Sequence, residues 1–104
     1  GAWGEIGPNR NHLRVTSAHT ASATNQIIGV SASAAVDIRL PNAADLESGQ
    51  VYIVKDESGN AGTHAISIKA SGSQTIDGVS QISLESPYAA VNLYTDGVSK
   101  YFIY

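Results

Sequence analysis

The chain has 104 residues, which suits a single domain, and its formal net charge is −3 with 14% charged residues. Because no basic field is present to attract phosphates or anionic lipid, we expect no nucleic-acid partner. No window approaches the roughly 18 apolar residues of a membrane span, so we expect no membrane insertion. The absence of cysteine excludes disulfide bonds, thiolate metal sites and a cysteine nucleophile.

The N-terminal residues 1–14 contain three glycines and one proline and follow neither a helical nor a strand period. This pattern predicts an arm or linker, with the folded domain in residues 15–104. Trp3 and Ile6 are unusual in such an arm, and they pack either on this domain or on another subunit. We therefore include both in a candidate subunit interface. The opening Gly-Ala pair also leaves open that the chain is a piece of a longer protein.

The middle of the chain alternates short apolar stretches with turn signals. Residues 27–30 form an apolar run, and residues 36–40 alternate apolar and polar side chains, which predicts a half-buried strand. Residues 41–48 lie between a proline and Gly49, a pattern that predicts one helical turn.

Two further turns follow. Residues 51–55 and 65–69 flank a loop rich in Asp, Ser, Gly and Asn, and we predict that they form a hairpin with a long connection. Asp77 and Gly78 lie between two β-branched residues, which predicts a tight turn with positive φ. About nine short strands, with turn signals about every 8 to 12 residues, indicate an all-β fold, a small antiparallel β-sandwich or jelly-roll-like domain.

The last hairpin turns at Asp96 and Gly97, and its loop length decides which residues lie opposite each other. A two-residue loop pairs Leu93 with Lys100, whereas a three-residue loop pairs Leu93 with Ser99. We predict the second register because it separates apolar from polar side chains better.

That register divides the hairpin into two faces. One face is predicted to close the core or a subunit interface and holds Val91, Leu93, Tyr101 and Ile103. The other face is predicted to meet a ligand or a second subunit and holds Asn92, Tyr94, Lys100 and Phe102. Five of the seven aromatic residues lie in the last seventeen positions. Aromatic rings beside amide groups are typical of sugar-binding surfaces and of subunit interfaces.

No pattern in the chain indicates catalysis. The three histidines share no short spacing with one another or with a carboxylate, so we expect no metal site. Residues 56–60 lack the alternating ligands of a calcium loop, and no Gly-x-Ser-x-Gly elbow or phosphate-binding glycine loop is present. We therefore expect a protein that is not an enzyme and that needs no cofactor.

Four motifs carry a resemblance to a known family. They are a Leu-Pro-x-Ala turn at residues 40–43, a Lys-Asp-Glu-Ser-Gly-Asn loop at 55–60, an Ile-Asp-Gly turn at 76–78 and a Tyr-x-Asp-Gly hairpin at 94–97. In this order and spacing, over residues 25–104, the chain resembles a β-domain found near the C-termini of bacteriophage tail fibres, tail spikes and other virion appendages.

The resemblance implies a homotrimeric β-sandwich at the distal end of a fibre, carried on the virion and extracellular when it acts. The candidate subunit interface then becomes a trimer interface with the residues Trp3, Ile6, Val91, Leu93, Tyr101 and Ile103. It implies attachment to a host cell-surface polysaccharide or protein receptor, and it carries over no catalytic residue or shared sugar site. Two alternatives remain: a structural domain that only drives trimerisation and fold registration of a fibre, and a monomeric accessory carbohydrate-binding module of an enzyme.

Overall fold

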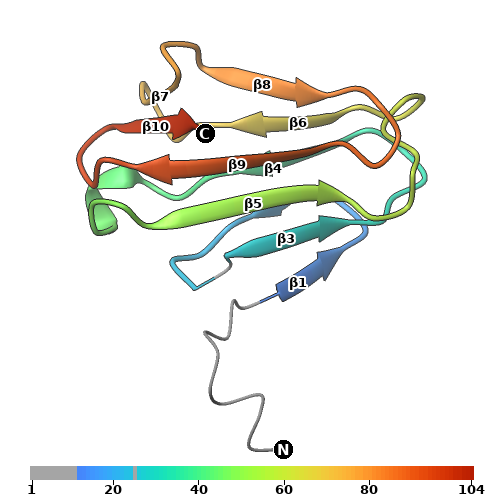
Figure 1. The fold of residues 1–104 in the computed structure, drawn as a ribbon, viewed down its shortest axis with the longest axis horizontal. Coiled ribbons are helices and arrows are strands. Elements are labelled where there is room, and N and C mark those ends of the chain that lie inside the picture. Colours follow the sequence, from blue (N-terminus) through green and yellow to red (C-terminus); the bar gives the residue numbers. More distant parts are fainter. Residues whose placement is uncertain (1–11, 25) are drawn as a thin grey trace, which may run out of the picture.

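The computed structural model describes residues 12–24 and 26–104, and these residues form ten strands and one short 3₁₀ turn (Figure 1). The elements in chain order are β1 (His12–Val15), β2 (His19–Thr20), β3 (Ile27–Val30), β4 (Val36–Arg39), η1 (Ala43–Asp45), β5 (Val51–Asp56), β6 (Ile66–Lys69), β7 (Thr75–Ile76), β8 (Gln81–Leu84), β9 (Ala90–Thr95) and β10 (Lys100–Ile103).

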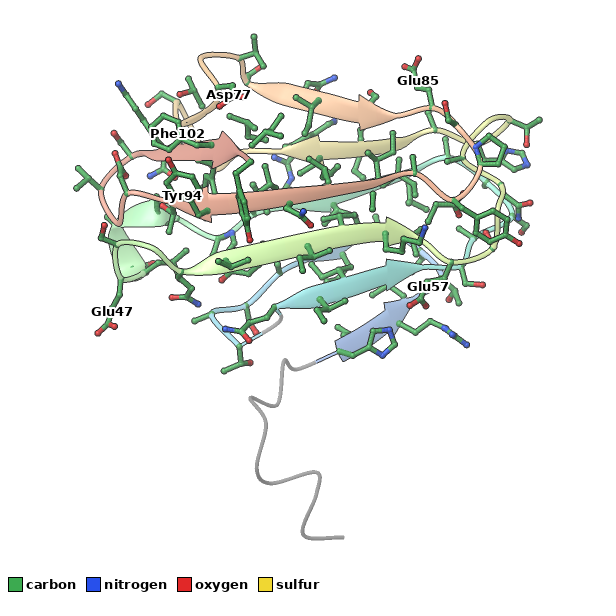
Figure 2. The ribbon with its side chains drawn as sticks, in the orientation of Figure 1. Glu47, Glu57, Asp77, Glu85, Tyr94 and Phe102 are labelled. Atoms are coloured by element: carbon green, nitrogen blue, oxygen red, sulfur yellow. The ribbon has the colours of Figure 1, made fainter. Side chains whose placement is uncertain are left out.

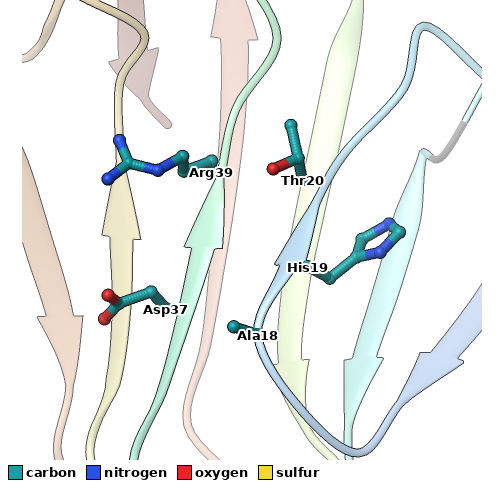
Figure 3. Close-up of a pocket in the computed structure, with 5 residues that line it drawn as sticks. All are labelled: Ala18, His19, Thr20, Asp37 and Arg39. Carbon is teal, nitrogen blue, oxygen red and sulfur yellow. The ribbon is translucent and has the colours of Figure 1, made fainter.

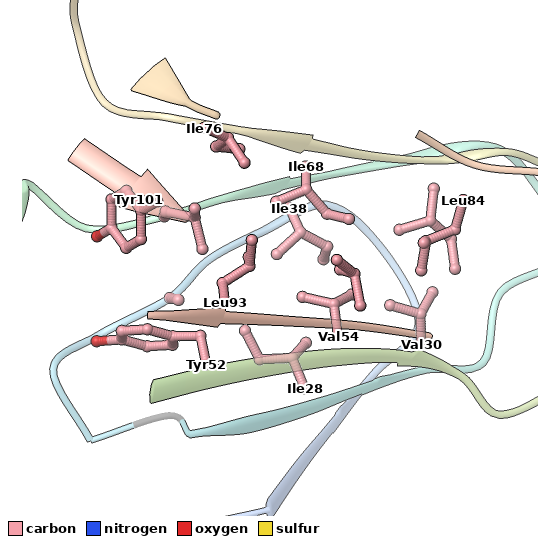
Figure 4. Close-up of a cluster of buried hydrophobic side chains, with 14 of the residues drawn as sticks. Ile28, Val30, Ile38, Tyr52, Val54, Ile68, Ile76, Leu84, Leu93 and Tyr101 are labelled. Carbon is pink, nitrogen blue, oxygen red and sulfur yellow. The ribbon is translucent and has the colours of Figure 1, made fainter. Parts of the chain in front are cut away.

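The strands form two sheets that enclose one hydrophobic core. The six-stranded sheet has the order β1-β3-β5-β9-β10-β7, and the four-stranded sheet has the order β2-β4-β6-β8. The buried side chains of both sheets meet between them, as Figure 4 shows. The predicted all-β sandwich is therefore confirmed.

The pairing within the sheets is not the predicted antiparallel, jelly-roll-like one. From β1 to β9 each strand lies in the opposite sheet from the strand before it, so strands that are neighbours in a sheet are not consecutive in sequence, except in the β9–β10 hairpin. Five of the eight described strand pairs are parallel. The predicted hairpin between β5 and β6 is also wrong, because the loop between them carries the chain from one sheet to the other. Period-2 alternation identifies a strand but not its partner.

The first strand begins earlier than expected. Strand β1 starts at His12 and runs parallel to β3, with His12 opposite Ile27. Residues 12–14 thus belong to the sheet, and the predicted boundary at residue 15 falls inside this strand. The remainder of the predicted arm, with its two candidate interface residues Trp3 and Ile6, lies outside the described residues.

Both turns predicted from local chemistry are present, but the helical turn predicted over residues 41–48 is shorter, Ala43–Asp45, and its caps are Asn42 and Leu46 instead of Pro41 and Gly49. Asn42 caps η1, since its side-chain Oδ1 accepts a hydrogen bond of 3.0 Å from the Ala44 amide. Asp77 and Gly78 have φ values of 48° and 84°, and the residues on either side of them exchange two backbone hydrogen bonds of 2.7 and 3.0 Å. Positive φ at both central positions is the geometry that favours Asp-Gly in tight hairpin turns.

The C-terminal hairpin has neither of the two registers considered from the sequence. Leu93 lies opposite Ile103, and the loop between β9 and β10 has four residues, 96–99. The Asp96 side chain explains the longer loop, because its Oδ1 accepts hydrogen bonds from the amides of Val98, Ser99 and Lys100 at 2.8, 3.0 and 3.1 Å. The register moves by an even number of residues, so each side chain keeps its predicted face.

Of the four hairpin residues predicted to close either the core or a trimer interface, three lie in the core of a single chain. Leu93 and Tyr101 are fully buried and Val91 is 9% exposed, whereas Ile103 is 41% exposed. The Tyr101 hydroxyl donates to the Pro41 carbonyl oxygen at 2.6 Å, and burial raises its pKa well above the ordinary value. No surface of Leu93 or Tyr101 is therefore accessible to a second chain, and of these four hairpin residues Ile103 alone is exposed enough for such a contact.

One carboxylate is buried at the end of β5. Asp56 is 1% exposed, and its two side-chain oxygens accept hydrogen bonds from the backbone amides of Ser58, Gly59, Ala61 and Tyr88 at 2.9 to 3.2 Å. Burial by itself would raise the pKa of Asp56, but these hydrogen bonds and one from the Ser58 hydroxyl outweigh it and lower the pKa. The ionised side chain thus holds the loop after β5 against the loop before β9.

Replacing Tyr101 by alanine should destabilise the chain itself. Loss of a buried aromatic ring costs about 3 to 5 kcal/mol. Lys100→Ala, one residue away and exposed, should cost less than about 0.5 kcal/mol. Urea unfolding of the two variants measures the difference. Equal and small effects would show that Tyr101 is not part of the core.

Removing the charge of Asp56 should lower stability and its pH dependence. Because the folded pKa is lowered, its contribution is present above the unfolded value of about 3.9 and is lost as the pH falls through the folded pKa. Asp56→Asn places an amide N–H₂ group against backbone donors, which should cost about 2 to 4 kcal/mol at pH 7.

Urea unfolding from pH 7 to pH 2 tests this prediction. The wild type should lose stability below about pH 4, and Asp56→Asn should lose less over the same range. Glu85→Gln removes a carboxylate from an exposed position and serves as the control. An Asp56→Asn curve parallel to that of the wild type would contradict the role assigned to this carboxylate.

Candidate functional site

Three aromatic side chains gather on the outer face of the six-stranded sheet, and we call them the aromatic cluster: Tyr94, Phe102 and Tyr104. The ring centroids of Tyr94 and Phe102 are 5.3 Å apart, and those of Tyr94 and Tyr104 are 5.7 Å apart. Tyr94 is 39% exposed and Tyr104 is 59% exposed. Figure 2 shows Tyr94 and Phe102 projecting from the neighbouring strands β9 and β10.

The strand geometry explains why the rings meet. Tyr94 lies directly opposite Phe102 in the antiparallel pair, and side chains opposite each other share a face. The chain end is held in line by two hydrogen bonds: the Tyr104 amide donates to the Asn92 carbonyl oxygen at 3.1 Å, and the Ile103 amide donates to Asp77 Oδ1 at 3.2 Å. These contacts place the last aromatic ring beside β9.

Aliphatic side chains continue this surface toward β3. Val51 of β5 lies opposite Tyr94, and Ile53 of β5 lies opposite Ile27 of β3. All three aliphatic residues are only partly buried. Together with the aromatic cluster they form a continuous surface, which we call the outer apolar face: Ile27, Val51, Ile53, Tyr94, Phe102 and Tyr104.

A charged group closes one end of the outer apolar face. The Glu57 carboxylate pairs with Arg14 Nε and with His12 Nε2, each at 2.8 Å. It lies over Gly29, where a Cβ atom would overlap it. Burial of Glu57 acts to raise its pKa, but the hydrogen bonds from Arg14 and His12 outweigh burial and lower the pKa. This contact ties β1 to the loop that follows β5.

The four ligand-binding residues predicted from the sequence all face outward. Tyr94 and Phe102 are in ring contact. Asn92 is exposed next to them on β9, and Lys100 is exposed at the start of β10. The sequence prediction did not include Tyr104 among the site residues, although the same alternation along β10 points to it. It also missed the aliphatic neighbours on β3 and β5, whose proximity depends on pairing between distant segments.

The four-stranded sheet has an outer face of different character. An open hollow of about 200 Å³ lies there, lined by Ala18, His19, Thr20, Asp37 and Arg39 (Figure 3). Asp37 Oδ2 accepts a hydrogen bond from Lys69 Nζ at 3.0 Å across the β4–β6 pair. The outward residues of this sheet are polar or small, in contrast to the outer apolar face.

Within residues 12–24 and 26–104, no group of three or more His, Cys, Asp or Glu side chains is placed to hold a metal ion. In the same part of the chain no helix has the length and apolar character needed to cross a membrane.

Comparison with known proteins gives no relative: no protein-family model matches the chain, and no curated protein shows a significant match. The geometry of the outer apolar face and the motif resemblance are therefore the basis for a functional proposal.

Proposed function

We propose that the chain is a host-attachment domain of a bacteriophage tail fibre or tail spike, which binds surface polysaccharide through the aromatic cluster and acts as a homotrimer. The observation that carries the proposal is the gathering of three rings on one sheet face, of which Tyr94 and Tyr104 are exposed and Phe102 is partly buried. A sugar ring has apolar C–H faces and a hydroxyl edge, and an aromatic ring beside polar groups matches both. Asn92 and Lys100 supply the polar groups next to the rings.

The shape of the aromatic cluster favours an extended chain over a single terminal sugar. Its rings are tilted by 34° and 60° to one another and lie on an open sheet face. Such a surface contacts a ligand from one side only, so affinity at one site is expected to be weak. Three copies in a trimer that bind the same polymer raise the overall affinity through effective concentration.

The placement in a virion appendage is supported by the motif resemblance over residues 25–104. Its motifs coincide with the turns that shape the fold: the loop held by Asp56, the Asp77-Gly78 turn and the loop capped by Asp96. These are positions where local chemistry dictates backbone geometry. The resemblance thus concerns the turns that shape the fold. The attachment role is a property of the resembled family, and we propose it for this chain by analogy.

A second candidate function is assembly of a fibre without a receptor site of its own. The aliphatic half of the outer apolar face favours it, because Ile27, Val51 and Ile53 form a continuous apolar strip on a sheet face that no other described element covers. Contiguous apolar surface of this kind marks protein–protein contacts. If a second copy of the chain packs on this aliphatic strip, part of the aromatic cluster stays accessible to solvent.

Shortening the rings should weaken binding to host surface polysaccharide. Tyr94→Ala and Phe102→Ala should each reduce affinity about tenfold, since ring stacking contributes about 0.5 to 1.5 kcal/mol beyond buried area. Val79→Ala is the control, because Val79 is apolar and 50% exposed but lies at the β7–β8 turn. Biolayer interferometry on immobilised polysaccharide extracted from the host surface measures the effect. Unchanged affinity in both aromatic variants would contradict the site.

A charge in the aliphatic strip should weaken self-association. The wild type is expected to sediment as a trimer at micromolar concentration, and Ile53→Glu should shift it toward monomer because it buries an unpaired charge at the contact. Val79→Glu adds the same charge elsewhere and should remain trimeric. A monomeric wild type would count against both fibre roles and favour an accessory carbohydrate-binding module.

A further inference from the structure

Four strands lie at the edges of the two sheets: β1 and β7 in the six-stranded sheet, and β2 and β8 in the four-stranded sheet. An edge strand presents unpaired N–H and C=O groups to any further strand, and shortness, charge or proline normally protects it. Strands β2 and β7 have only two residues each. Strand β1 carries the exposed side chains of His12 and Arg14, both paired with Glu57. Three of the four edges are therefore protected.

Strand β8 has none of these protections. Its four residues, Gln81–Leu84, include no charged residue and no proline, and they pair with β6 at consecutive positions without a bulge. Within the described ranges no strand pairs with its other side, and Figure 1 shows β8 at the upper rim of the sandwich. Strand β8 is thus the open edge of the described fold.

The pairing with β6 fixes which backbone groups of β8 point outward. The Ala70 amide donates to the Ser80 carbonyl oxygen at 3.1 Å, and the pairing of β6 with β8 continues from this contact in unbroken register. Backbone groups alternate in direction along an antiparallel strand, so the even-numbered residues of β8 bond to β6. The N–H and C=O groups of Gln81 and Ser83 therefore point away from the sheet.

The side chains of β8 also show that a neighbour is missing. Gln81 and Ser83 are exposed on the outer face. Ile82 faces the core opposite Ile68, yet it is only partly buried, whereas Ile68 is fully buried. Ile68 has a paired strand on each side, and Ile82 has one on one side only. An added strand would bury more of Ile82.

We propose that the open edge of β8 pairs antiparallel with the same edge of a second copy of this chain, with Ile82 opposite the partner's Ile82. In this register Gln81 lies opposite the partner's Ser83, and Ser83 lies opposite the partner's Gln81. Each of these pairs exchanges both of its backbone hydrogen bonds, because the groups of Gln81 and Ser83 already point outward. The two isoleucines lie side by side on the inner face, and the polar residues pair on the outer face.

The self-complementarity of the edge favours a second copy as its occupant. A two-fold axis at Ile82 places the same hydrogen-bonding groups and the same side-chain types on both sides of the contact. The charges also agree with it. Glu85, the first charged residue after the strand, lies opposite the partner's Val79 in this register, and the Cα atoms of the two Glu85 residues are about 20 Å apart. No like charges therefore lie opposite each other.

The length of the edge sets the strength of the contact. A standard interface buries about 1,200 to 2,000 Å², and so short a ladder covers far less. We therefore expect a dissociation constant in the millimolar range. The contact lies at the edge of the four-stranded sheet, apart from the outer apolar face, so it does not depend on the proposed function. It gives copies that already belong to different trimers a way to pair side by side.

Amide chemical shifts of the isotope-labelled chain at about 50 µM and about 2 mM test the proposal. The amides of Gln81 and Ser83 should shift with concentration. A mixture of labelled and unlabelled chains should show an Hα–Hα Overhauser effect between Ile82 and the partner's Ile82, because Cα atoms approach most closely in a pair without hydrogen bonds. Shifts that do not change with concentration would overturn the proposal. Overhauser contacts from this edge to a segment other than β8 would assign it a different occupant and also overturn it.

A proline on the open edge should block the contact. Ser83→Pro removes an outward N–H but no hydrogen bond to β6, and proline is tolerated on an edge strand when its missing N–H faces solvent. We expect self-association to weaken at least about tenfold. Ser83→Ala keeps the N–H and is the matched control, which should associate as the wild type does. A folded Ser83→Pro variant with wild-type self-association would overturn the proposal, and a dispersed amide spectrum shows that it is folded.

Charged pairs test the register without removing any backbone group. Gln81→Glu combined with Ser83→Lys places opposite charges across both outer pairs and should strengthen association about threefold. Gln81→Glu combined with Ser83→Glu places like charges there and should weaken it by about as much. The reverse order would contradict antiparallel pairing in this register. Ile53→Glu, which tests the aliphatic strip, should leave association through β8 unchanged, so failure of the proposed function and failure of this inference are read separately.

Discussion

The arrangement of the sandwich depends on the buried carboxylate of Asp56. It lies where the chain leaves the six-stranded sheet, and it accepts hydrogen bonds from the loop after β5 and from the Tyr88 amide just before β9. One side chain therefore fixes the departure of the chain toward β6 and its return to β9. Since β9 then runs antiparallel to β5, the outward residues of β9 continue the surface that β3 and β5 begin.

The strand-by-strand alternation between sheets has a consequence for function. Apart from the β9–β10 hairpin, each sheet is assembled from segments that are not adjacent in sequence, so its outer face collects residues from distant stretches of the chain. The outer apolar face combines aliphatic residues of β3 and β5 with aromatic residues near the C-terminus, and the other face combines polar residues of β2, β4 and β6. The two outer faces of the sandwich therefore differ in chemistry.

The sequence predicts those features that depend on local chemistry. The Asp77-Gly78 turn, the helical turn after Pro41 and the outward position of Tyr94 and Phe102 follow from turn preferences and from alternation within one strand. The hairpin register was mispredicted because Asp96 caps three amides and lengthens the loop, yet the faces survived because the shift was even.

Features that depend on distant pairing could not be predicted in the same way. Parallel neighbours such as β3 and β5 carry no signal in either segment alone, so the aliphatic part of the outer apolar face and the hollow beside Arg39 emerge only in the structure. Burial of Tyr101 and Leu93 within one chain likewise depends on the opposite sheet, which the sequence did not locate.

The most direct measurement of the central claim is a set of nuclear Overhauser effects between a bound polysaccharide fragment and the protein. We expect contacts from sugar C–H protons to the ring protons of Tyr94, Phe102 and Tyr104, because stacking brings the sugar face against the aromatic cluster. Binding of the fragment without any contact to these three rings would contradict the account.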